Sequence, residues 1–257
     1  MKFACLTLSF NQGQFLQEAI SSIKTQSVNF EYLIYDPGST DGSREIAEKS
    51  VDAQTKIHFV NGDQGPADGL NIGLKELSGD IFYYLNADDK VKPNAFEFVE
   101  NYFNKHLECD VLHGSIELIN GKGEYLKTLP AINFSLRGYA LGYSVLYQQA
   151  TFIRMSALKS NPFNTSNRIS WDGELIVDLA ISGKVIHKTN KILGEFRIYE
   201  NSISGSPGYR QLVRKEHARI AQKILGHKPR PNQKLYAFGI RILKAIFRRI
   251  FPRISYI

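Results

Sequence analysis

The feature that most constrains this 257-residue chain is a regular alternation of short apolar runs and amphipathic segments over its first 110 residues. Phe3–Leu8 has the length and composition of a strand buried on both faces. Phe15, Leu16, Ile20 and Ile23 then recur at helical spacing, which predicts a helix over residues 14–26. The alternation continues with strands at 30–35, 57–60 and 81–85, helices at 43–51 and 67–77, and a helix opened by Pro93. Such alternation predicts an α/β domain with a mostly parallel sheet flanked by helices.

The pattern changes after residue 110. Strands are predicted at 111–113 and 116–119, followed by a Gly-rich turn and a strand over Tyr125–Leu129. A helix over 174–181 ends before Gly183, and strands follow at 185–187 and 192–198.

Charge divides the chain into two parts. Residues 1–205 carry 19 Lys and Arg against 24 Asp and Glu, whereas residues 206–257 carry 13 against one. We therefore predict an acidic body over 1–205 and a basic, amphipathic helical tail over 206–257, which meet different partners.

Two lone cysteines, Cys5 and Cys109, support neither a disulfide framework nor a zinc cluster, and favour a reducing compartment. The N-terminus is too short and polar for a signal peptide, and no apolar run approaches the ~20 residues that cross a bilayer. A cytoplasmic location is expected.

Polar loops follow each of the first four predicted strands. In an open parallel sheet, ligands bind beyond the carboxyl ends of the strands, so these loops should form one site. One of them is Asn86-Ala87-Asp88-Asp89, whose adjacent carboxylates suit Mg²⁺ or Mn²⁺ held against a diphosphate. The alternative is an ordinary turn in which Asp89 caps the following segment.

Asp36 ends the second strand and precedes a turn rich in Gly and hydroxyl residues. Its carboxylate is free to accept from a base N–H, while Thr40 or Asp41 caps the next helix. Several other classes of site have no motif here: the chain has no dinucleotide fingerprint, no P-loop, no H-E-x-x-H and no G-x-S-x-G elbow.

Together these loops resemble those of family-two inverting glycosyltransferases with the GT-A fold, a Rossmann-like architecture. The matching segments, in order, are 7–11, 36–43, 63–71 and 86–89, and the resemblance covers residues 1–205. The most similar subgroup builds bacterial surface polysaccharides.

The resemblance implies a role for each matching residue. Phe10 and Asp36 would contact the nucleotide base, and Asp68 and Asn71 would lie near the ribose and phosphates. Asp88 and Asp89 match the family's DxD-type element, but Asn86 replaces its first acid, which leaves open which of the two binds the metal.

Residues 148–154 resemble the family's acceptor-side strand, and the segment from Trp171 onward resembles the element that supplies the catalytic base. Asp172 aligns best with that base and Glu174 is the second choice, although Glu174 could simply complement the helix dipole. Arg197 is expected to neutralise the leaving diphosphate. Tyr199 stands where family members often have His, which weakens any claim of a histidine ligand there.

The tail over 234–254 places large apolar residues on one helical face and cations on the other. Such a helix suits an anionic membrane surface, which predicts a peripheral protein on the inner face of the cell membrane with a glycan or lipid-linked acceptor. Packing on the body or a dimer interface are the alternatives. Nucleic acid is not expected, because no recognised binding module accompanies the basic run.

The sequence thus predicts an inverting, metal-assisted transfer of a sugar from a nucleotide-diphospho-sugar, with a UDP-sugar favoured. A non-catalytic nucleotide-sugar or glycan-binding module on the same fold is the main alternative. A nucleotidyltransferase would need a Gly-rich, cationic loop after the first strand, which residues 11–14 do not supply.

Overall fold

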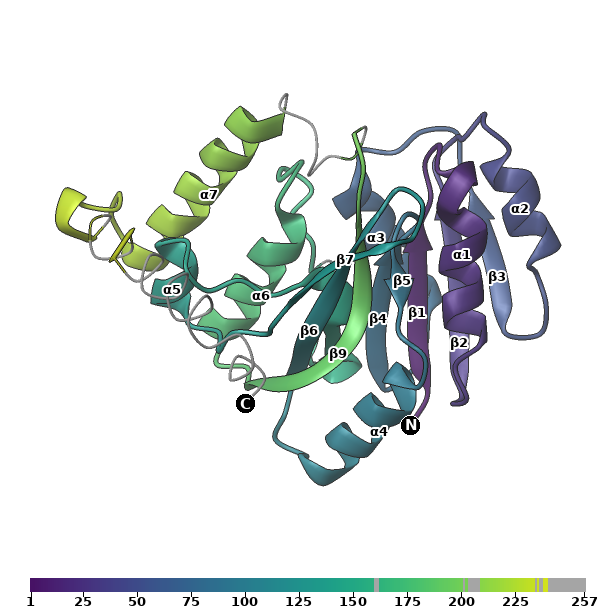
Figure 1. The fold of residues 1–257 in the computed structure, drawn as a ribbon, viewed down its shortest axis with the longest axis horizontal. Coiled ribbons are helices and arrows are strands. Elements are labelled where there is room, and N and C mark those ends of the chain that lie inside the picture. The colour runs from purple at the N-terminus through teal and green to yellow at the C-terminus, as the bar shows by residue number, and fades with distance from the viewer. Residues whose placement is uncertain (160–161, 201, 203–208, 234, 236–237, 240–257) are drawn as a thin grey trace.

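Strand β1 (Phe3–Leu8) lies at the centre of the parallel half of the sheet. It pairs in parallel with β2 (Phe30–Asp36) and with β4 (Ile81–Asn86), and β2 pairs in parallel with β3 (Thr55–Phe59). Their connections are the helices α1 (Gly13–Lys24), α2 (Ser43–Lys49) and α3 (Pro66–Glu76). The carboxyl ends of these four strands therefore share one edge, as the alternation predicted. This computed structural model describes residues 1–159, 162–200, 202, 209–233, 235 and 238–239 (Figure 1).

The other half of the sheet is mixed. Strand β8 (Thr151–Arg154) pairs antiparallel with both β4 and β6 (Val111–Asn120), and β6 pairs in parallel with β9 (Ile186–Ile198). Two short strands are added antiparallel, β7 (Tyr125–Leu129) on β6 and β5 (Lys90–Val91) on β9. The order of the sheet is β3-β2-β1-β4-β8-β6-β9-β5, and β7 lies off this path, paired with β6. The prediction of an α/β sheet flanked by helices is confirmed, with antiparallel pairs confined to this half.

Helices cover both faces of the sheet, as Figure 1 shows. On one face, α1 and α4 (Ala95–Lys105) bury their apolar stripes against the strands, and Phe3 of β1 stacks on Phe96 of α4 with ring centroids 4.5 Å apart. On the other face, α3 and α6 (Trp171–Ile181) bury Leu70, Leu74 and Leu175. Each such side chain stabilises the fold by about 1.5–3 kcal/mol relative to exposure.

The sheet curls so that its last strand returns to its middle. Only Ala87, Asp88 and Asp89 separate β4 from β5, although the two strands stand far apart in the sheet order. The Val91 amide of β5 donates to Ser22 of α1 at 3.2 Å. The curl therefore closes against α1.

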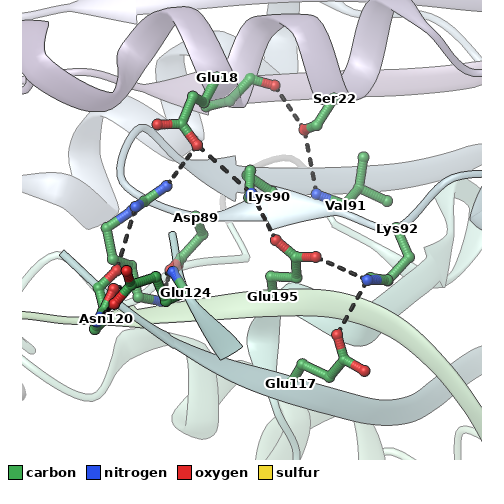
Figure 2. Close-up of polar contacts among 12 residues, drawn as sticks. Glu18, Ser22, Asp89, Lys90, Val91, Lys92, Glu117, Asn120, Glu124 and Glu195 are labelled. Carbon is green, nitrogen blue, oxygen red and sulfur yellow. Dashed lines mark hydrogen bonds and ion pairs between the residues drawn. The ribbon is translucent and has the colours of Figure 1, made fainter. Parts of the chain in front are cut away.

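An ion-pair network holds β5 in this position (Figure 2). Lys90 contacts Glu18 of α1 at 3.5 Å and Glu195 of β9 at 2.8 Å. Lys92 contacts Glu195 at 2.8 Å and Glu117 of β6 at 3.0 Å. The network thus joins α1, the segment after Asp89 and the two long strands β6 and β9.

The described part of the basic extension packs on the body. Helix α7 (Arg210–Leu225) places Ile220 against Tyr139 of α5 (Leu136–Ala140) and Val177 of α6. Two short 3₁₀ helices, η1 (Gln148–Ala150) and η2 (Met155–Ala157), flank β8. The expected membrane-binding helix over 234–254 lies largely outside the described residues. Among the residues described, no helix combines the length and apolarity that crossing a bilayer requires.

Candidate functional site

Three cavities lie where the sequence predicted a site. The first, cavity A, has a volume of about 420 Å³ and lies between the loops that follow β1, β2 and β3. Phe10, whose side chain is 57% exposed, lines it together with Tyr35 and Asp63. Arg168 reaches cavity A from the segment before α6 and comes so close to Gly65 that a Cβ there would lie 2.7 Å from its guanidinium. Cavity A is therefore a partly aromatic pocket with one acid and one cation in its wall.

Cavity B, of about 350 Å³, contains the adjacent acids. Its wall includes Asp88, Asp89 and Tyr199, and it shares Leu8 and Phe10 with cavity A. Cavities A and B therefore adjoin one another. Oxygen atoms dominate the polar part of this wall, which also includes Gln12 and Asn86.

Cavity C, of about 200 Å³, lies beside the start of α6. Asp172 lines it among mainly apolar neighbours such as Tyr139, Leu146 and Leu175. Trp171, the residue before Asp172, lines cavity B instead. Cavities B and C are thus neighbours across the first turn of α6.

Asp36 is fully buried and lines none of cavities A, B and C, although its chain neighbours Tyr35 and Pro37 line cavity A. Its Oδ1 accepts from the amides of Gly38 and Ser39 at 2.9 and 2.8 Å and from Nε of Arg44 at 3.0 Å. Burial raises the pKa of Asp36, but these hydrogen bonds outweigh it and hold the pKa below its usual value. Its Oδ2 accepts no hydrogen bond from the described residues, so an ionised acceptor remains.

The two adjacent acids have different surroundings. Asp89 is almost fully buried, with Oδ1 accepting from the Arg197 amide at 2.9 Å and Oδ2 from Gln149 at 2.8 Å. Asp88 is half-buried, and among the described side chains only the Tyr199 hydroxyl donates to its carboxylate, at 3.1 Å. Burial raises the pKa of both acids, and the charge of Asp88 raises that of Asp89 further. Asp88 is the acid with an oxygen available to a hard cation.

Arg197 does not face cavity B as the sequence-based hypothesis expected. Its side chain is fully buried and lies over the Phe15 ring, with its guanidinium carbon 4.4 Å from the ring centroid. Nε donates to the backbone carbonyl of Asp88 at 2.8 Å, and Nη2 pairs with Glu18 at 2.9 Å. Nη1 donates to the carbonyls of Asn120 and Gly121. These contacts commit the guanidinium to positioning the loop that carries Asp88.

The two candidate bases, Asp172 and Glu174, have different surroundings. Burial raises the pKa of Asp172, and no cation among the described residues pairs with it. Glu174 is 1% exposed and lines none of cavities A, B and C. Arg219 contacts both of its oxygens, and Asn164 and Asn167 donate to one of them. Although burial opposes it, this set lowers the pKa of Glu174 to about 2.

Asn71 and Asp68, which were predicted to contact the nucleotide-sugar donor, line none of the three cavities. Asn71 is buried and bonds the backbone of Phe163 in both directions, at 2.8 and 3.0 Å. Asp68, in the first turn of α3, accepts from the Gln64 amide at 3.0 Å and so shapes the loop before the helix. Asp63 takes the wall position in the same loop. Sequence reasoning missed Asp63, although the motif contained it, and missed Arg168, for which the sequence carries no signal.

Glycosyltransferases of several bacteria are similar to this chain in sequence. Curated relatives include an uncharacterized glycosyltransferase of Haemophilus influenzae, 32% identical over 141 residues, which are 49% of this chain and 56% of that protein. Another, from Rickettsia felis, is 34% identical over 122 residues, which are 46% of this chain and 20% of that protein. The chain thus spans about half, or less, of the length of these relatives.

Solved structures show the same fold. S. aureus TarS 1–349 in complex with UDP superposes with a TM-score of 0.66 over 98% of this chain and 72% of that one, at 18% identity. The mannosyltransferase PcManGT from Pyrobaculum calidifontis, in complex with GDP-Man and Mn²⁺, superposes with a TM-score of 0.61 over 99% and 84%, at 14% identity. The GT-A fold implied by the sequence resemblance is therefore confirmed.

The family assignment rests on the sequence profile of Glycosyl transferase family 2, which matches residues 5–159. That segment holds the wall residues of cavity A up to Pro66, both adjacent acids and the 148–154 segment. It is also more than half of the chain, and the chain belongs to glycosyl transferase family 2.

Proposed function

We propose that the protein transfers a sugar from a nucleotide-diphospho-sugar to a hydroxyl of a glycan or lipid-linked acceptor, with inversion at the anomeric carbon. One observation carries the proposal: adjoining cavities B and C each hold a carboxylate that forms no ion pair with a described cation, Asp88 in B and Asp172 in C. An inverting transfer needs these two functions, one at the leaving diphosphate and one at the attacking hydroxyl.

The donor nucleoside would occupy cavity A. Phe10 offers an exposed ring against which a base can stack, and Asp36 Oδ2 offers an ionised acceptor for a base N–H. The structural relatives were solved with UDP, UDP-GlcNAc or GDP-Man, which supports a nucleoside-diphosphate donor, and we favour a UDP-sugar. Asp63 and Arg168 complete the wall and would contact the donor in place of Asp68 and Asn71.

A divalent cation, Mn²⁺ or Mg²⁺, would bind in cavity B. The residues fit such an ion because Asp88 combines an accessible carboxylate with the amide oxygens of Gln12 and Asn86 in the same wall. Asp89 would hold the loop in place through Arg197 and Gln149 rather than bind the ion. When bound, the metal supplies positive charge against the departing diphosphate.

The chain's own residues would carry the proton. Asp172 would accept the proton of the acceptor hydroxyl while that oxygen bonds to the anomeric carbon. As this bond forms, the bond from the anomeric carbon to the diphosphate oxygen breaks and its electron pair leaves with the nucleoside diphosphate. Burial raises the pKa of Asp172, which makes it a stronger base than an exposed Asp. Glu174 is a poor candidate, because its carboxylate is held by Arg219 and its pKa is about 2.

Cavity C would admit the acceptor. Its wall is mainly apolar, with Tyr139 and Leu146 near Asp172, which suits the weakly polar face of a sugar ring. The composition of residues 234–254 supports membrane association, so we propose a lipid-linked or membrane-proximal acceptor, a role in surface polysaccharide synthesis and a peripheral location on the cytoplasmic side.

A thermal-shift series tests the donor site. UDP, GDP, dTDP, CMP and NAD would each be added with and without Mn²⁺, to the wild-type protein and to Asp88→Ala. A ligand that binds only the folded state raises the melting temperature. The proposal expects a Mn²⁺-dependent shift with one nucleoside diphosphate that is absent in Asp88→Ala. Folded protein that responds to no nucleotide would favour a non-catalytic glycan-binding module instead.

A further inference from the structure

A second cluster of metal-ligating side chains lies away from the three cavities. It consists of His106, Glu108 and His187, whose nearest ligand atoms all lie within 4.8 Å of one another. His106 is the C-cap of α4 and His187 is the second residue of β9. In Figure 1, α4 lies at the end of the sheet that carries the chain N-terminus, opposite the carboxyl ends of β1 and β2.

The two distances from the histidines to Glu108 are close to those between neighbouring ligands of a tetrahedral ion. His106 Nδ1 lies 3.5 Å from Glu108 Oε1, and His187 Nε2 lies 3.7 Å from the same oxygen. With metal–ligand bonds of about 2.0–2.2 Å, two ligands of a tetrahedral zinc ion stand about 3.4 Å apart. Small rotations of exposed side chains would therefore bring the three ligands around one ion.

Two features hold the rings in place. The Tyr102 hydroxyl lies 3.1 Å from His187 Nδ1, which leaves Nε2 directed at Glu108. The ring of Tyr102 also packs against that of His106, with centroids 4.3 Å apart. A hydrogen bond to the second ring nitrogen of a histidine is the usual way in which proteins orient a metal-binding imidazole.

The backbone of the loop is fixed as well. Arg154 of β8 donates from Nε to the carbonyl of Cys109 at 3.0 Å and from Nη2 to that of His106 at 3.4 Å. Cys109, the residue after Glu108, is fully buried, and its thiol donates to the Val111 carbonyl. The ligand set is therefore two imidazoles and one carboxylate.

We propose that His106, Glu108 and His187 form a Zn²⁺ site that joins the end of α4 to the start of β9, with a fourth position open to water. Two imidazole nitrogens favour zinc over Mg²⁺ or Mn²⁺, which prefer oxygen ligands. The side chains are 41%, 58% and 26% exposed, so an ion can enter from solvent. The proposal is independent of the proposed transferase activity, and its ion differs from the one expected at Asp88.

The test is a calorimetric titration of the full-length protein, freed of any polyhistidine tag, with ZnCl₂ and separately with MnCl₂. The double variant His106→Ala/His187→Ala is expected to bind zinc at least about 100-fold more weakly, the upper end of the loss caused by removing an outer-shell partner. His58→Ala is the matched control, because His58 also contacts a glutamate, Glu76, but belongs to no metal-ligating group among the described residues. It should bind zinc like the wild type.

Two further measurements test the same zinc site. Tyr102→Phe retains the packing on His106 but loses the contact to His187, so zinc affinity should fall roughly tenfold without loss of fold. Co²⁺ should give the intense visible bands of a four-coordinate site in the wild type and not in the double variant. Equal zinc affinity in the wild type and the double variant, or loss of zinc binding in Asp88→Asn, would overturn the proposal.

Discussion

Arg197 and Asp88 are joined by a hydrogen bond of 2.8 Å, in which the buried guanidinium Nε donates to the Asp88 backbone carbonyl. The amide of the same arginine donates to the carboxylate of Asp89 at 2.9 Å. Arg197 of β9 therefore contacts both adjacent acids. It lies 108 positions after Asp89 in the chain. It fixes the backbone of the first acid and the side chain of the second.

The two acids should respond differently to amide substitution. Asp88→Asn should leave the melting temperature nearly unchanged, because among the described side chains only Tyr199 donates to that carboxylate, yet it should abolish Mn²⁺-dependent nucleotide binding. Asp89→Asn should destabilise the fold by about 1–3 kcal/mol, because an amide donor would then face the Arg197 N–H or the Gln149 amide. Urea unfolding and nucleotide titration of both variants check this. The reverse pattern would exchange their roles.

Asp172→Asn should lower kcat by about 10²–10⁴-fold, the usual contribution of a general base, with little change in the KM for the donor. Initial rates with a nucleotide-sugar and its acceptor measure the effect. Asp178→Asn is the matched control, since Asp178 lies on the same helix but pairs with Lys223 at the surface, and it should keep wild-type kcat. Near-normal turnover in Asp172→Asn would remove Asp172 from the mechanism.

The pH dependence of turnover should reflect the same group. Burial raises the pKa of Asp172, and only the deprotonated form accepts a proton, so kcat should fall as pH drops through a value above the ordinary ~3.9 of aspartate. A pH–kcat profile at saturating donor shows this limb. Nucleotide affinity measured over the same range separates it from effects on binding. An acidic limb in the ordinary aspartate range would contradict the burial argument.

Glu174 should affect stability rather than chemistry. Its folded-state pKa of about 2 lies below the ordinary 4.5, so its stabilisation is fully present above pH 4.5 and is lost as pH falls toward 2. Glu174→Gln should lower the free energy of unfolding by roughly 2–4 kcal/mol at pH 7, because it leaves Arg219 without its main partner. Denaturant unfolding at pH 7 and at pH 3 should show a smaller difference at pH 3. An equal difference at both values would mean that the charge is not the cause.

The sequence located the local parts of this fold well and the long-range parts poorly. Phe3–Leu8 forms a strand with the predicted bounds, because a short apolar run is a local signal. β5 has two residues, Lys90 and Val91, and exists only because β9 pairs with it. The separately predicted runs at 111–113 and 116–119 join into one strand, since Gly114 allows Leu193 of β9 to pack closely.

The site shows the same division. The sequence singled out Asp36, Asp88 and Asp172 as predicted site residues, because each ends a strand, follows one or lies in the first turn of a helix in a family pattern. It could not show that Arg197 is buried or that Glu174 pairs with Arg219, since both facts depend on contacts between segments far apart in the chain. Charge alone does not tell whether a residue faces a ligand or another part of the protein.

The short segment between β4 and β5 has a consequence for the motions of the site. Ala87, Asp88 and Asp89 cross from the middle of the curled sheet to its last strand, so neither end of the segment is free. Binding loops usually open at a small free-energy cost, but this one cannot open unless β5 leaves β9. The Asp89 amide, which donates to the Asn86 carbonyl at 3.1 Å, should therefore exchange its hydrogen almost as slowly as the core strands do. Asp88 would then bind the proposed cation from a rigid backbone, and a change in metal affinity would require a change in the sheet itself.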